Sequence, residues 1–173
     1  MQGTTLEPGR LALTALMLAL GLLAIYIEAA PLGTGALAPP SPDLLLAVVV
    51  YWSARRPRST PLIGVFILGL VRDMLTDAPI GAGALALVFA AEFLRRIRHR
   101  LARGSFISEW LVLAAAAFGT SAFLWLLITL TLTKPPFIAV LFHQSLYTIM
   151  LYPLVVVALR WGLRISWPEA RSE

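Results

Sequence analysis

Long apolar runs dominate this sequence, and they restrict the chain to folds whose surface largely faces a nonpolar medium. Apolar residues are continuous within each run and do not alternate with polar ones, so they predict helices and not a membrane β-barrel. We therefore expect an all-α polytopic membrane protein, a bundle of six transmembrane helices forming a single domain over residues 1–173. The expected spans are about residues 11–30, 43–54, 61–77, 80–94, 107–132 and 137–160.

The composition agrees with a membrane protein. The chain is 59% hydrophobic and only 13% charged, whereas soluble domains are about a quarter charged. It contains no cysteine, which excludes disulfides and thiolate metal sites. A net charge of +5 can indicate a nucleic-acid partner, but here the arginines stand in short clusters between apolar runs. Such clusters are typical of topology signals, so we expect no nucleic-acid binding.

The basic residues also predict the orientation of the bundle. If the N-terminus lies inside, every lysine and arginine except Arg72 and Lys134 falls in an internal segment. Internal loops of membrane proteins carry an excess of basic residues. We therefore expect six spans with both termini in the cytoplasm.

The second and third runs differ from the others because they are short or interrupted. Residues 44–54 make a helix of about 16 Å, against a hydrocarbon core of about 30 Å. Asp43 directly precedes this run and is predicted to be its N-cap. The third run contains Arg72 and Asp73 and leads into a proline-glycine turn at residues 78–81.

The stretch from residue 69 to 84 is the main candidate site, because charge within an apolar span is costly and usually functional. Asp77 follows Asp73 at the i+4 position on the same helix face. The alternative to a functional role is that both acids lie at the membrane interface and are solvated there. Arg72 points about 100° away from Asp73 and is a poor direct partner for it. Glu28 and Asp43 are expected at the same outer surface. Carboxylates there could hold a cation or proton, but no metal-ligand spacing is present.

No pattern indicates an enzyme or a cofactor. The sequence has no HExxH, GxSxG or P-loop motif, and its histidines His99 and His143 have no catalytic partners at suitable spacing. Glu92 is predicted to pair with arginines three and four residues later on the helix surface. Pro153 is predicted to kink or locally unwind the last helix.

Several short motifs follow one another along the chain: Pro42-Asp43, Tyr51-Trp52, Gly69-Leu70 with Asp73, Gly81, and Leu151-Tyr152-Pro153-Leu154 before a basic tail. In their order and spacing these motifs resemble the MreD family of rod-shape-determining membrane proteins, and the resemblance covers the whole chain. The sequence departs from the family pattern at two places. Arg72 stands where an apolar residue is expected, and residues 53–56 shorten an apolar stretch.

The resemblance implies a non-enzymatic subunit of the cell-elongation machinery in the bacterial inner membrane. It implies MreC as direct partner. The peptidoglycan polymerase RodA, its penicillin-binding transpeptidase and the MreB filament belong to the wider assembly, with membrane lipid around the bundle. We expect the hairpin of residues 69–81 and Asp43 to form the contact surface for MreC. The candidate contact residues are Asp43, Tyr51, Gly69, Arg72, Asp73, Asp77 and Gly81.

Two alternatives belong to other functional classes. The substrate-capturing membrane subunits of energy-coupling vitamin transporters are similar in size, helix number and basic internal loops, and they share the Ala15–Ala19 pair. Their ligand pocket requires aromatic and polar groups near the outer loops, but residues 31–42 contain no aromatic residue. An ion carrier built on Arg72 and Asp73 is the other alternative.

Overall fold

The computed structural model describes residues 8–30, 41–76, 79–101, 106–130 and 138–163. Within these ranges the chain forms six α-helices and one short 3-10 helix and contains no strand, so the expected all-α fold is confirmed. The helices are α1 (Pro8–Ala29), α2 (Leu44–Arg55), η1 (Pro57–Ser59), α3 (Leu62–Leu75), α4 (Ala82–Leu101), α5 (Phe106–Leu130) and α6 (Ile138–Leu163).

Helix α2 is the centre of the bundle. All its residues from Leu45 to Ser53 are buried, and it packs against α1, α4, α5 and α6. A helix that is apolar around its whole circumference requires such an enclosed position. Because other helices surround it, its length of about 18 Å need not match the thickness of a bilayer.

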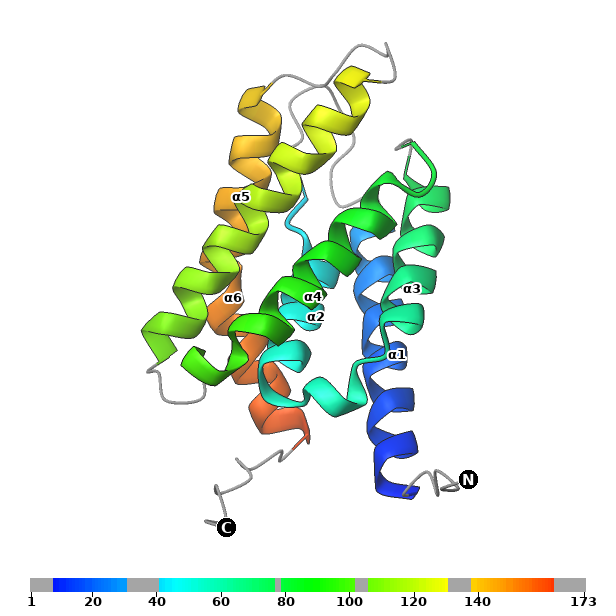
Figure 1. The fold of residues 1–173 in the computed structure, drawn as a ribbon, viewed down its shortest axis with the longest axis vertical. Coiled ribbons are helices and arrows are strands. Elements are labelled where there is room, and N and C mark those ends of the chain that lie inside the picture. The colour runs from blue at the N-terminus through cyan, green and yellow to red at the C-terminus, as the bar shows by residue number, and fades with distance from the viewer. Residues whose placement is uncertain (1–7, 31–40, 77–78, 102–105, 131–137, 164–173) are drawn as a thin grey trace.

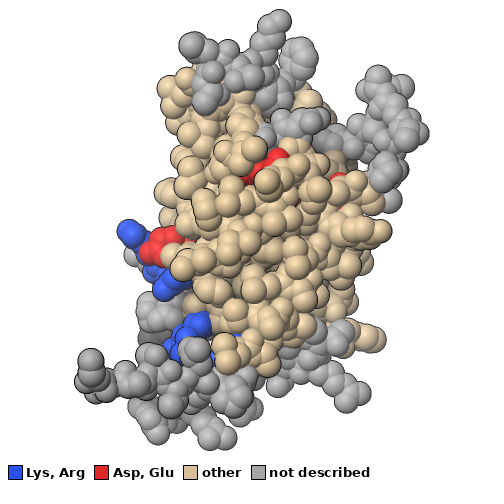
Figure 2. All heavy atoms as spheres, turned by 90° about the vertical axis from the view of Figure 1, so that its right-hand side faces the viewer, with Lys and Arg blue, Asp and Glu red and all other residues tan. Residues whose placement is uncertain are grey.

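Three of the outer helices are long and apolar enough to cross a membrane: α1, α5 and α6. Most of their side chains are not buried within the bundle. Exposed apolar faces of this extent are costly in water and suit contact with lipid or with helices of a partner. The surface in Figure 2 is accordingly almost free of charge over its broad middle.

Helix α4 extends further than its apolar run. The run was expected to end at residue 94, but the helix continues through the first arginines of the basic segment to Leu101. Glu92 lies 3.9 Å from Arg95 and 3.2 Å from Arg96, which confirms the predicted surface ion pairs. These pairs and the high helix propensity of arginine explain the extension.

The arginines are distributed unevenly along the bundle. In Figure 1, α1 begins and α6 ends at the lower end, whereas α3 and α4 meet at the upper end. Arg10 at the start of α1 donates to the carbonyl of Arg58 in η1, which places these arginines together. Figure 2 shows basic residues from about mid-height downward, with an acidic area beside them, and further small acidic areas toward the upper end.

Candidate functional site

The first turn of α2 lies inside the bundle, and two carboxylates satisfy its backbone N–H groups. Asp43 is the N-cap, as the sequence predicts: its Oδ1 accepts the Leu46 N–H at 2.8 Å. Glu28, from the last turn of α1, accepts the Leu45 N–H with its Oε1 at 2.8 Å. The first N–H groups of a helix have no hydrogen-bond acceptor within the helix. Inside an apolar bundle no bulk water is available to accept from them, so side chains have to do so.

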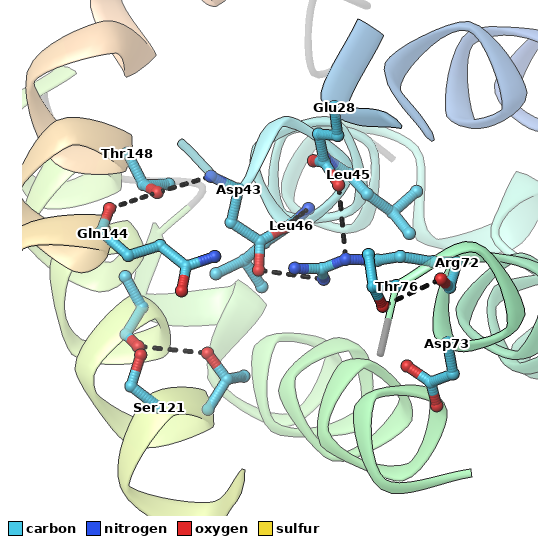
Figure 3. A network of polar contacts seen from close by, with 12 residues as sticks. Glu28, Asp43, Leu45, Leu46, Arg72, Asp73, Thr76, Ser121, Gln144 and Thr148 are labelled. Atoms are coloured by element: carbon cyan, nitrogen blue, oxygen red, sulfur yellow. Dashed lines mark hydrogen bonds and ion pairs between the residues drawn. The ribbon is translucent and has the colours of Figure 1, made fainter. Parts of the chain in front are cut away.

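Arg72 holds the two carboxylates together. Its Nε lies 3.2 Å from Oε2 of Glu28, and its Nη1 donates to Oδ2 of Asp43 at 3.0 Å. One guanidinium from α3 thereby links the end of α1 to the start of α2 (Figure 3). We call Glu28, Asp43 and Arg72 the Arg72 network. The sequence could have indicated it, because an arginine within an apolar run needs an acid partner, and these two acids flank the neighbouring runs.

Asp73 acts on the turn that follows α3. It is only 3% exposed, and its Oδ2 accepts the N–H groups of Gly81 at 2.9 Å and Ala84 at 3.1 Å. Gly81 has a φ of +93°, a backbone conformation that favours glycine. A side chain at Gly83 would collide with Oδ1 of Asp73. The residue therefore ties the end of α3 to the first turn of α4.

Gly69 permits α3 and α4 to approach closely. A Cβ at this position would collide with the backbone of Ala84. The small residues Ala86 and Ala90, further along α4, are also buried. Together with the turn at Gly81, this contact makes α3 and α4 a tightly packed unit, which we call the α3–α4 hairpin.

The remaining predicted site residues lie elsewhere or outside the described residues. Tyr51 is buried near the other end of α2, with the guanidinium of Arg55 4.7 Å above its ring centre. It therefore does not join the Arg72 network. Asp77 is not among the residues that the structure describes.

Pro153 lies within α6, which continues through it as one helix. Proline has no N–H to offer to the carbonyl four residues earlier, which belongs to Ile149. The indole N–H of Trp110 on α5 donates to that carbonyl at 2.9 Å. The bond missing from α6 is thus replaced by a contact between α5 and α6, a contact that the sequence analysis did not identify.

A cavity of about 60 Å³ with a mixed polar and apolar lining lies between the α3–α4 hairpin and the α5–α6 pair, above the first turn of α2. Its size suits a few water molecules. Asp43, Arg72 and Asp73 line one side, and Figure 3 shows Ser121 and Gln144 on the other. Among the described residues, no group of three histidine, cysteine or acidic side chains is placed to hold a metal ion.

Comparison with known protein families shows which family the chain belongs to. The family model described as "rod shape-determining protein MreD" matches residues 9–162, nearly the whole chain. The chain belongs to the MreD family. It is therefore a rod shape-determining membrane protein. No curated protein and no solved structure matches the chain. The Arg72 network, the α3–α4 hairpin and the cavity all lie within the matched residues.

Proposed function

We propose that this MreD-family protein is a non-enzymatic scaffold subunit of the cell-elongation complex in the bacterial inner membrane, and that it binds MreC. RodA, its penicillin-binding transpeptidase and the MreB filament are then indirect partners. The chain forms one domain over residues 1–173 and crosses the membrane six times, with both ends in the cytoplasm. The basic residues that gather in the lower half of the bundle support this orientation.

The observation that carries the proposal is the direction of the charged groups in the α3–α4 hairpin. Arg72 and Asp73 are turned inward and bonded to other parts of the bundle. The large side chains that project from the described part of the hairpin near its turn are instead apolar: Met74, Leu75 and Ile80 are all well exposed. We call these three residues the hairpin tip, and we propose that it contacts MreC.

The predicted contact residues have a different role in this proposal. Gly69 and Gly81 shape the hairpin, while Asp43, Arg72 and Asp73 fix its position against α1, α2 and α4. Large apolar side chains exposed at the end of a rigid hairpin are typical anchors of a protein interface. The charged residues therefore act on MreC binding through the position of the tip.

The cavity does not favour the vitamin-transporter alternative. Pockets for drug-sized ligands have about 300 to 1,000 Å³ and are lined largely by apolar and aromatic side chains. The cavity beside Arg72 has about 60 Å³, and its described lining contains no aromatic side chain.

Bulky substitutions at the hairpin tip test the proposal. Met74→Trp and Ile80→Trp replace side chains that are each 71% exposed, so they leave the fold intact but obstruct a partner. Met150→Trp and Ile138→Trp on α6, where exposure is 68% and 67%, are matched controls. We expect the tip variants to retain about a tenth or less of the MreC recovered with the unmodified protein from native membranes.

The controls should retain normal recovery of MreC, and all four variants should accumulate in the membrane to the same level. The proposed contact is wrong if the tip variants recover as much MreC as the controls. It is equally wrong if the α6 variants lose MreC and the tip variants do not.

A further inference from the structure

The C-terminal end of α2 holds three buried hydrogen-bond donors without an acceptor. Trp52 and Ser53 are 1% and 0% exposed, and neither the indole Nε1 nor the hydroxyl has a hydrogen-bond partner in the described part of the chain. The same holds for the buried Nε of Arg56. A buried polar group without a partner is costly, so an acceptor is expected to reach these groups.

The three residues occupy one side of the end of α2. Trp52 and Ser53 precede Arg56 by four and three positions, the spacings at which side chains are neighbours on a helix. The backbone of Arg56 is held in place, because its N–H donates to the Trp52 carbonyl at 2.7 Å and its carbonyl accepts the Ser59 N–H at 2.9 Å. Arg56 is itself partly exposed, so a ligand can reach it from the surface. We call Trp52, Ser53 and Arg56 the Arg56 site.

Positive charge around the Arg56 site is not balanced by described acids. Among the residues that the structure describes, no acidic side chain forms an ion pair with Arg56, Arg58 or Arg10. Arg10 donates to the carbonyl of Arg58 at 3.1 Å, which brings a further basic residue to this end of α2. The C-terminus of a helix carries only about half a negative charge, which offsets a small part of the excess.

The donors also restrict the chemistry of a ligand. An indole N–H and a guanidinium can donate hydrogen bonds but cannot accept them, so a ligand has to supply acceptors. The excess of positive charge requires that ligand to be an anion. The oxygens of a phosphate group match both requirements, because the N–H groups of arginine are arranged to bind two oxygens of one oxyanion.

The depth of the site in the bundle is that of the membrane interface. The apolar span of α1 covers 21 residues and begins at Gly9. Its length of about 31 Å is close to the thickness of a hydrocarbon core, so its first turns lie at the edge of that core. Arg10 and Thr14 in these turns donate to carbonyls of η1, the segment directly after Arg56. An arginine at this depth extends to the phosphate groups of the lipids.

We propose that the Arg56 site binds a phosphate group, and that an anionic phospholipid with a phosphatidylglycerol headgroup supplies it. A zwitterionic lipid carries its own cation beside the phosphate, and no described acid at this end of α2 receives that cation. The Arg72 network lies at the opposite end of the same helix. Binding of this lipid therefore does not depend on MreC binding at the hairpin tip.

Lipid selectivity tests this proposal directly. The purified full-length protein is titrated with phosphatidylglycerol and with phosphatidylcholine of the same acyl chains, and bound lipid is counted by native mass spectrometry. Both lipids contain a phosphate group, but only phosphatidylglycerol has a net negative charge. We expect about a tenfold preference for phosphatidylglycerol.

Two variants identify the site. Arg56→Gln removes the positive charge of a partly exposed side chain, and Trp52→Phe removes the indole N–H but keeps an aromatic ring. Arg96→Gln is the matched control. It removes the same charge toward the same end of the bundle (Figure 1), from a side chain that is 77% exposed and paired with Glu92.

We expect Arg56→Gln to lose most of the tenfold preference, Trp52→Phe to reduce it about threefold, and Arg96→Gln to keep it. Equal binding of the two lipids by the unmodified protein overturns the proposal. So does a preference that survives in both site variants, or one that falls as much in Arg96→Gln as in Arg56→Gln. Binding of inorganic phosphate that requires Arg56, without any lipid preference, supports the phosphate site but overturns its assignment to a lipid.

Discussion

Removal of the Arg72 guanidinium is the sharpest test of the structural site, because the chain contains a matched ion pair on its surface. The Nε of Arg72 lies 3.2 Å from a carboxylate oxygen of Glu28, and the Nε of Arg96 lies 3.2 Å from one of Glu92. The side chains of the first pair are 17% and 6% exposed, and those of the second 77% and 38%. The two pairs thus share this Nε–O distance and differ in burial.

This difference in burial decides the expected magnitudes. Arg72→Leu leaves the carboxylates of Glu28 and Asp43 without a counterion inside the bundle. Removal of one partner of a buried ion pair costs about 3 to 5 kcal/mol. Arg96→Leu removes an exposed pair at the i+4 spacing, which contributes about 0.5 kcal/mol. We therefore expect a difference of about 3 kcal/mol between the two variants.

The free energy of unfolding in mixed detergent micelles, measured by titration with sodium dodecyl sulfate, checks this expectation. A triple variant with Arg72→Leu, Glu28→Gln and Asp43→Asn should recover most of the loss. Its two amide oxygens still accept the N–H groups of α2, and no unpaired charge remains. Equal destabilisation by Arg72→Leu and Arg96→Leu would refute the idea that the network neutralises buried charge. So would a triple variant no more stable than Arg72→Leu.

Two further predictions concern helix packing, and the same unfolding titration checks both. Gly69→Ala should destabilise the protein by about 2 kcal/mol because its Cβ meets the backbone of α4, whereas Gly119→Ala, which has open space around it, should be neutral or slightly stabilising. Trp110→Phe should lower the free energy of unfolding by about 1 kcal/mol because it leaves the Ile149 carbonyl without a hydrogen bond. This loss should be smaller in a Pro153→Ala background, where the backbone N–H of residue 153 can donate to the same carbonyl. Equal effects of the two glycine variants, or an unchanged Trp110→Phe cost beside Pro153→Ala, would contradict the packing described.

The helices could be predicted from the sequence, but the central position of α2 could not. Hydropathy distinguishes apolar segments from polar ones, and it does not distinguish burial in lipid from burial among other helices. The run before Arg55 is apolar on every side, which fits both environments. The extension of α4 through its arginines was missed for a related reason. Their charge was interpreted as a loop signal, although arginine is a good helix former.

The residues of the site were identified, but not their contacts. Arg72 and Asp73 were recognised as unusual because charge within an apolar run is costly. Their partners come from other helices: the sequence shows that Arg72 needs an acid partner and that Glu28 and Asp43 are candidates, but it does not specify the contacts. The role of Asp73 was also hidden because its oxygen binds backbone N–H groups, which every residue except proline carries. The N-cap role of Asp43, in contrast, depends on local sequence and was predicted correctly.

The short central helix explains why the polar groups gather at one place. Because α2 begins inside the bundle, its first N–H groups need acceptors, and Asp43 and Glu28 supply them. Two carboxylates in that position require a cation, which Arg72 provides from α3. Arg72 thereby fixes the end of α3, and the next residue, Asp73, fixes the start of α4. The hairpin tip and the cavity consequently depend on the same few contacts, made by two adjacent residues of α3.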